Sequence, residues 1–246
     1  MSKENASETK KENSADKNFS IDTKNQRLVT ENIKEALEVV FMSTGWPERA
    51  GEYAGKVKIY ELMKAVLEHN HAFIQVYIGF SLKKAKNNSE NFRSALELTQ
   101  GKENVTLILF SAGALNSGTI NIPDNVKHVI FISPMVGEEV IQERRLDLIT
   151  KFLLKRLSVP KTIGEYLSSE HMQKLAQRAN EGDVKITLIT TENDTYIKTK
   201  KIIEEFKKIF ENIIVKEESL RDHAPDQSEI IETVYGETEE TKNSLA

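Results

Sequence analysis

The chain has 246 residues, 39% of them hydrophobic, which is enough for one α/β domain with a substantial core. Its 34 basic and 38 acidic residues give a formal charge of -4, so no basic excess predicts nucleic acid as a partner. The absence of cysteine excludes disulfides, thiolate metal sites and a cysteine nucleophile, and we expect a soluble, cytoplasmic protein.

The two ends of the chain are polar and are predicted to be tails. Residues 1–25 contain few apolar side chains among many Lys, Glu, Ser, Asn and Asp residues, which predicts disorder. Residues 236–246 form a short acidic counterpart. The beginning of the sequence has no apolar leader, and no stretch approaches the roughly 18 apolar residues of a membrane span.

Between the tails, short apolar runs alternate with segments of helical periodicity, which is typical of βαβ units around a mostly parallel sheet. The apolar runs predict strands at residues 38–43, 72–80, 105–111, 126–134, 184–190 and 212–218. The periodic segments predict helices at residues 54–70, 90–100 and 194–212. Residues 26–137 and 183–235 would form the core, and residues 138–182, with helices in succession and no strand, would form a helical cap insertion.

The segment "LDLITKFLLKRL" (residues 146–157) presents a broad apolar face. Three interpretations stay open: packing against the body of the domain, lining an apolar substrate pocket in which Phe152 would take part, and binding to a membrane surface.

Three strand ends carry residue types that can work together in catalysis. Ligands of open parallel sheets bind at the carboxyl ends of the strands, so residues just after each strand are candidates. In chain order these ends supply Ser111, Asp194 and His223. A histidine that removes the serine proton, held by a carboxylate, makes a serine nucleophilic near neutral pH.

Each of these residues also has an ordinary structural interpretation. Ser111 could be a turn serine, with Ser117 as the alternative nucleophile or a helix-end residue. Asp194 could cap the following helix, and Glu192 in the same loop could replace it as the acid. His223 could be a surface histidine.

From about residue 35 to residue 235 the chain resembles the α/β-hydrolase family. The family's oxyanion loop is similar to "TGWPE" at Gly45, Trp46 and Pro47, and its acid motif to "TENDTYI". The resemblance implies an oxyanion hole made by the N–H of Ala112 together with that of Gly45 or Trp46. It also implies a chain that starts near the family's third strand and lacks the first hairpin.

The sequence departs from the family at two positions. The nucleophile turn is usually Gly-x-Ser-x-Gly, whereas here Leu109 stands at the first glycine and Gly113 keeps the second. A bulky side chain there requires a looser turn or smaller neighbours. Thr44 replaces a histidine that is common in the oxyanion loop.

The remaining histidines and aromatic residues give weaker signals. Phe110 and His171 are expected beside the substrate. His69 and His71 flank a helix-to-strand junction without further metal ligands, and His128 falls inside a strand. We expect no metal and no cofactor, and no nucleotide-binding motif is present.

The predicted function is a serine hydrolase that cleaves a carboxylic ester, thioester or similar acyl bond of a small molecule through an acyl-enzyme. Two alternatives stay open. One is a catalytically inactive α/β-hydrolase fold that serves as a binding or structural partner, and the other is an unrelated Rossmann-like sheet whose strand ends imitate a triad. A homo-oligomer or a protein partner is compatible with either function.

Overall fold

The computed structural model describes residues 20–21, 28–31, 33–45, 60–77, 88–143, 151, 154–155, 157–219 and 226–236. Its strands are β1 (Ser20–Ile21), β2 (Leu28–Glu31), β3 (Glu38–Thr44), β4 (Ala72–Tyr77), β5 (Asn104–Phe110), β6 (Val126–Ile132), β7 (Lys185–Thr191) and β8 (Ile214–Glu218). Its helices are α1 (Tyr60–Glu68), α3 (Asn88–Glu97), α5 (Ile163–Leu167), α6 (Glu170–Asn180), α7 (Thr199–Ile209) and α8 (Gln227–Tyr235), with 3-10 helices η1 (Ser111–Gly118) and η2 (Glu138–Val140).

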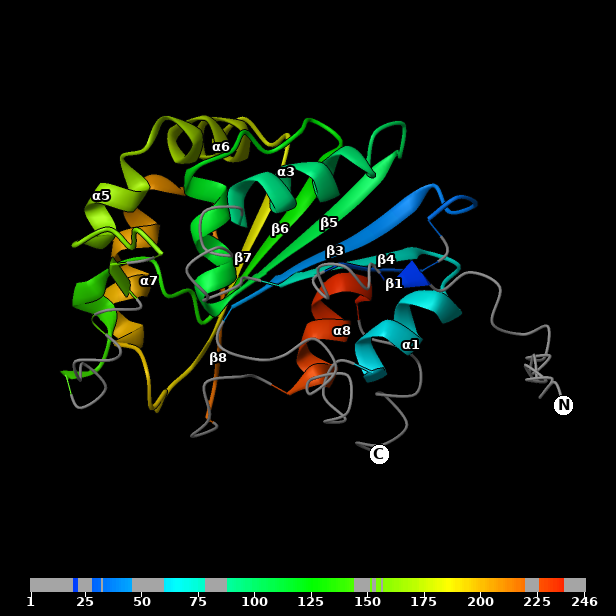
Figure 1. Ribbon diagram of the computed structural model, residues 1–246. Helices are drawn as coiled ribbons and strands as arrows, with labels where there is room; N and C mark the ends of the chain where they lie inside the picture. Colours follow the sequence, from blue (N-terminus) through cyan, green and yellow to red (C-terminus); the bar gives the residue numbers. More distant parts are fainter. Residues whose placement is uncertain are drawn as a thin grey trace, which may run out of the picture.

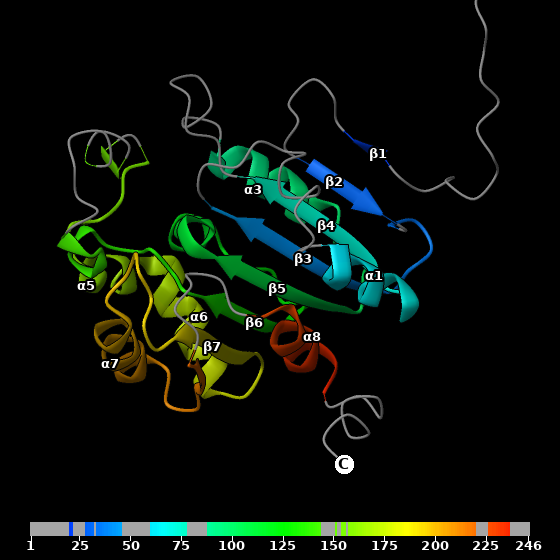
Figure 2. The same cartoon turned by 90° about the horizontal axis from the view of Figure 1, so that it is seen from below.

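The strands form one sheet in the order β1-β2-β4-β3-β5-β6-β7-β8. The six strands from β3 to β8 are parallel to one another, and Figure 2 shows most of this order across the sheet. Their residues are rich in Val, Ile, Leu and Phe and are mostly buried, as expected for strands covered on both faces. The predicted mostly parallel α/β sheet is therefore confirmed.

The expectation that the chain lacks a first hairpin is wrong. Strand β2 pairs antiparallel with β4, and β1 pairs antiparallel with β2 through Ser20 opposite Thr30. The segment "LVTE" (residues 28–31) escaped detection because four residues are too short to show a periodic pattern. Strand β1 also lies inside the segment 1–25 that was predicted to be a tail.

Helices cover the two faces of the sheet unequally (Figure 1). Alternate strand residues, among them Leu107, Leu109 and Phe131, join the larger apolar cluster with residues of α3, η1, α5, α6 and α7. The intervening residues, such as Ile108 and Ile130, join a smaller cluster with residues of α1 and α8. The sheet is therefore the middle layer of three.

Much of the segment expected as a cap, residues 138–182, is described and packs on the sheet. Tyr166 of α5 and Met172 and Leu175 of α6 are buried in the larger cluster. These helices belong to the core layer, so a separate cap remains a prediction only for the part of the segment before residue 163. Leu154, from the apolar face of residues 146–157, is fully buried in the same cluster. None of the described helices combines the length and apolar character of a membrane crossing.

Helices α1 and α8 are joined to each other on the second face. The backbone N–H of Leu62, in the first turn of α1, donates to Oε1 of Gln227, the first residue of α8, over 2.9 Å. At the other end of α8, the Tyr235 hydroxyl lies 3.2 Å from Nδ1 of His71. His71 in turn lies 3.2 Å from the Glu38 carboxylate. This helix pair is thus fixed at both ends.

The buried His128 makes stability dependent on pH. Burial, and secondarily the charge of Lys185, lowers the pKa of His128 from 6.5 to about 4, while its Nε2 lies 2.9 Å from Thr187 Oγ1. Between these pH values the unfolded chain binds a proton at this site that the folded chain does not. Its contribution is therefore complete above pH 6.5 and is lost as the pH falls toward 4, by about 3 kcal/mol.

We expect the His128→Gln variant to lose that part of the pH dependence. The measurement is urea denaturation at a series of pH values between 4 and 7.5. The control is His171→Gln, which removes a half-buried histidine whose hydrogen bond to Asn121 is exposed. Parallel stability profiles for wild type and His128→Gln would contradict the assignment.

Candidate active site

Ser111 occupies a sharp turn between β5 and η1. Its φ angle is +52°, a left-handed value that non-glycine residues rarely adopt, and only 2% of its surface is exposed. Such strain persists where the surroundings enforce it, and it gathers at functional sites. The predicted strand-to-helix turn at this serine is therefore present.

Gly113 explains how η1 approaches the sheet so closely. A Cβ atom on Gly113 would collide with the carbonyl oxygen of Ser43 in β3 and would lie 2.7 Å from its carbonyl carbon. The Asn116 amide, one turn further along η1, donates to Ser43 Oγ over 3.2 Å. The second glycine of the turn is thus required by packing against β3.

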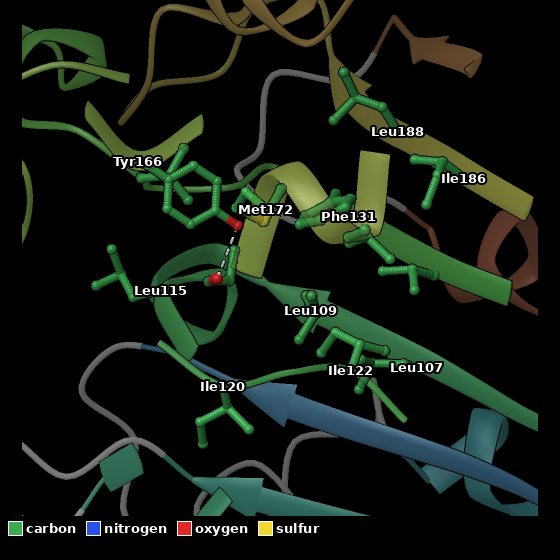
Figure 3. Close-up of a cluster of buried hydrophobic side chains, with 14 of the residues drawn as sticks. Leu107, Leu109, Leu115, Ile120, Ile122, Phe131, Tyr166, Met172, Ile186 and Leu188 are labelled. Carbon is green, nitrogen blue, oxygen red and sulfur yellow. Dashed lines mark hydrogen bonds between the residues drawn. The ribbon is translucent and has the colours of Figure 1, made fainter. Parts of the chain in front are cut away.

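Leu109, which stands at the position of the family's first glycine, packs into the core. Its side chain is completely buried in the larger cluster, and Figure 3 shows it among the other buried side chains of that cluster. It is opposite Ser43 on one side and Phe131 on the other in the sheet register. Ser111 keeps its positive φ angle nonetheless, so the leucine does not abolish the turn.

Of the two backbone N–H groups expected to complete the oxyanion hole with Ala112, the structure describes only that of Gly45. The N–H of Gly45 donates to the Phe110 carbonyl over 3.1 Å, so the assignment of this N–H to an oxyanion is corrected. A Cβ on Gly45 would lie 2.7 Å from Ala112 Cα and nearer still to Ala112 N. Gly45 therefore lies directly against the Ala112 backbone, in a contact that has no room for a side chain, and the Ala112 N–H has no partner within η1 because it lies in the first turn. Trp46, the other candidate donor, lies outside the described residues.

Ser117 is held in a structural hydrogen-bond network. Its hydroxyl lies 2.6 Å from the Tyr166 hydroxyl and donates to the Ala114 carbonyl over 2.7 Å. Burial raises the pKa of Tyr166 well above its ordinary value, so the phenol stays protonated. This network fixes η1 to α5, and it leaves Ser117 poorly suited to be the alternative nucleophile.

Asp194 lies just after β7 and is only 4% exposed. Its Oδ1 accepts hydrogen bonds from the N–H groups of Tyr196 over 2.7 Å and Ile197 over 3.0 Å. The residue capping α7 is Lys198, so Asp194 orders the turn before the helix and is not its cap. Glu192, the alternative acid, is exposed.

The remaining predicted site residues differ in where the structure places them. His223 and Phe152 lie outside the described residues, so the contact between the serine and a histidine stays a prediction. Phe110 is buried in the smaller cluster with residues of α1 and α8, so its role beside a substrate is not supported. His171 is half-buried, and its Nδ1 lies 2.7 Å from Asn121 Oδ1 in an exposed contact. Thr44 is buried and donates to the Val76 carbonyl over 3.4 Å.

The described residues contain no group of three or more His, Cys, Asp or Glu side chains that could hold a metal ion. His69 instead stacks on Tyr235, with ring centroids 3.9 Å apart, and His71 contacts Glu38. This pair of histidines therefore belongs to the junction of α1, β4 and α8.

Sequence analysis did not identify Ser133 and its turn as neighbours of Ser111. The turn after β6 begins with Ser133, whose φ angle is +40°, and its Met135 N–H donates to the Ser111 carbonyl over 3.1 Å. The signal was the sequence "FISP" at another strand end, where a polar residue follows an apolar run in the same way as Ser111.

Comparison with known proteins assigns the fold. No protein-family model and no curated protein matches this chain. Est1E from Butyrivibrio proteoclasticus is similar with a TM-score of 0.57 at 14% identity, over 88% of this chain and 96% of that chain. The esterase Pf2001 from Pyrococcus furiosus gives 0.53 at 14% identity, over 89% and 82%. An alpha-beta serine hydrolase homologue from Coxiella burnetii gives 0.51 at 13% identity, over 84% and 88%. The chain therefore has the α/β-hydrolase fold.

The packing of η1 predicts opposite effects of alanine at two glycines. Gly113→Ala should destabilise the protein by about 3 kcal/mol, because the new methyl group meets the backbone of β3. Gly164→Ala is the control: its Cβ would lie 3.7 Å from the nearest atom, Thr162 Oγ1, and alanine favours the helix by about 0.5–1 kcal/mol. Urea denaturation measures both, and equal stabilities of the two variants would contradict the account.

A second pair of variants separates packing from strain at the turn. Leu109→Ala and Leu107→Ala each remove a large side chain from the same fully buried cluster. Each should therefore lower the free energy of unfolding by about 3 kcal/mol. If Leu109 strained the turn, its removal would cost much less than removal of Leu107. The difference between the two free energies of unfolding is the decisive quantity.

Proposed function

We propose that this protein is a serine hydrolase that cleaves a carboxylic ester, thioester or similar acyl bond. The observation that carries the proposal is the strained Ser111 beside the N–H of Ala112, in a turn packed tightly between β3 and η1. A turn of this kind costs free energy, and presenting a nucleophile next to an oxyanion donor gives a reason for keeping it. The hydrolases and esterases among the similar structures support the reaction class.

In this mechanism the Ser111 oxygen attacks the acyl carbonyl carbon while His223 accepts the serine proton. The N–H groups of Ala112 and Trp46 stabilise the negative oxygen of the tetrahedral intermediate. Its collapse breaks the bond to the leaving group, which receives the proton from His223. A water molecule, deprotonated by His223, then releases the acid and restores Ser111.

Asp194 is the proposed orienting acid. It is buried at the end of β7, and two backbone N–H groups fix its Oδ1, so its orientation is predetermined. A buried carboxylate beside His223 would hold the reactive tautomer and stabilise the imidazolium that forms during attack. Glu192 is a weaker candidate because its side chain is exposed.

The proposed substrate is a small acyl ester, and no cofactor or metal is required by the mechanism. The cytoplasmic location remains an expectation, with which the cysteine-free sequence is compatible.

Labelling with a fluorophosphonate probe tests the proposal. We expect the wild type to be labelled and to hydrolyse p-nitrophenyl esters, and we expect both activities to be lost in Ser111→Ala and His223→Ala. Asp194→Asn keeps the acceptor for the two N–H groups and removes the charge, so kcat should fall by about 1,000- to 10,000-fold with little loss of stability.

Ser117→Ala is the matched control, because it removes another buried serine of the same helix. It should retain labelling while losing stability through the lost bond to Tyr166. A folded wild type that is neither labelled nor active on any ester would favour the catalytically inactive binding protein instead.

A further inference from the structure

Two buried hydroxyl groups lie at neighbouring strand ends without hydrogen-bond partners in the described structure. They are Ser133 Oγ, just after β6, and Thr190 Oγ1, near the end of β7, and both residues have no exposed surface. Buried hydroxyl groups are nearly always paired, because an unpaired one loses its bonds to water and gains nothing in return. Two such groups at one sheet edge therefore indicate a polar site that a bound molecule can complete.

Backbone hydrogen bonds place both residues between Ser111 and Asp194. The Ser133 N–H donates to the carbonyl of Ile189, the residue before Thr190, over 2.9 Å. The turn that begins at Ser133 also donates to the Ser111 carbonyl, through Met135. On the other side, the Asp194 N–H donates to the carbonyl of Thr191, which follows Thr190, over 3.3 Å.

The Thr190 side chain also lies on the face of the sheet that η1 covers. Leu188 belongs to the larger cluster and Ile189 to the smaller one, so alternation puts Thr190 on the same face as Leu188 and η1. Ser133 has a positive φ angle of +40°, as Ser111 has at the neighbouring strand end. Two serines with strained backbone angles at adjacent strand ends cost stability, which indicates a functional role for this edge of the sheet.

We propose that Ser133 and Thr190 form a polar subsite that hydrogen-bonds a hydroxyl group on the acyl part of the substrate. This inference rests on the proposed hydrolase and names its substrate class as hydroxyacyl esters. A hydroxyl group suits the site because each side chain can both donate and accept. A carboxylate suits it less, because neither residue supplies a positive charge to a buried anion.

The test compares two esters that differ by one group of similar size, p-nitrophenyl 3-hydroxybutanoate and p-nitrophenyl 3-methylbutanoate. The ratio of their kcat/KM values cancels differences in protein concentration and general activity. We expect Thr190→Val and Ser133→Ala each to lower the ratio of hydroxy to methyl ester about three- to tenfold. Thr187→Val is the control, since Thr187 is equally buried in β7 but its hydroxyl already contacts His128, and its ratio should not change.

Thermal unfolding of the ligand-free protein adds an independent readout. Thr190→Val should be at least as stable as the wild type, because it removes an unpaired hydroxyl. A destabilised Thr190→Val with an unchanged ester ratio means that the hydroxyl groups bind a resident water only, and overturns the subsite while the hydrolase stands. A wild type that neither hydrolyses these esters nor reacts with fluorophosphonate overturns the hydrolase, and the subsite with it.

Discussion

The close contact of η1 with the end of β3 is the constraint on which the candidate site depends. Gly113 lies against the Ser43 carbonyl with no space for a side chain, and Asn116 adds a hydrogen bond to the same residue. Because the helix must begin immediately after β5 and lie this close, the chain has to reverse direction at Ser111, which explains the positive φ angle there. The free energy lost in this strained turn is offset by the packing on both sides of it.

Around this turn the strand ends collect small and neutral groups. Gly45 lies in close contact with the Ala112 backbone, and Ser133 lies at the end of the adjacent strand. The carboxylate of Asp194 is set further along the edge, after β7, where backbone N–H groups orient it. Because Ser111 and Asp194 are both buried, each electrostatic contact they make is stronger than it would be in water.

Sequence reasoning predicted the parallel strands well because apolar runs bounded by turn residues are typical of strands buried on both faces. It missed β1 and β2, whose four or fewer residues carry no periodic signal. It also treated α5 and α6 as part of a cap, since the number of successive helices does not reveal that Tyr166 reaches Ser117 through the core. The engagement of the Gly45 N–H and the space around Leu109 depend on register and three-dimensional packing, which spacing along the chain does not encode.

The bond between Leu62 and Gln227 has a consequence for how this protein can change. The chain that follows Gly45 re-enters the described structure at α1, and the chain that follows β8 re-enters it at α8. Both proposed contributors beyond Ser111 and Asp194, Trp46 and His223, belong to these two connections. Because the helices are joined at their first turns, the last residue of one connection and the last residue of the other are held to the same point. Loss of this single bond would therefore release the ends of both connections at once.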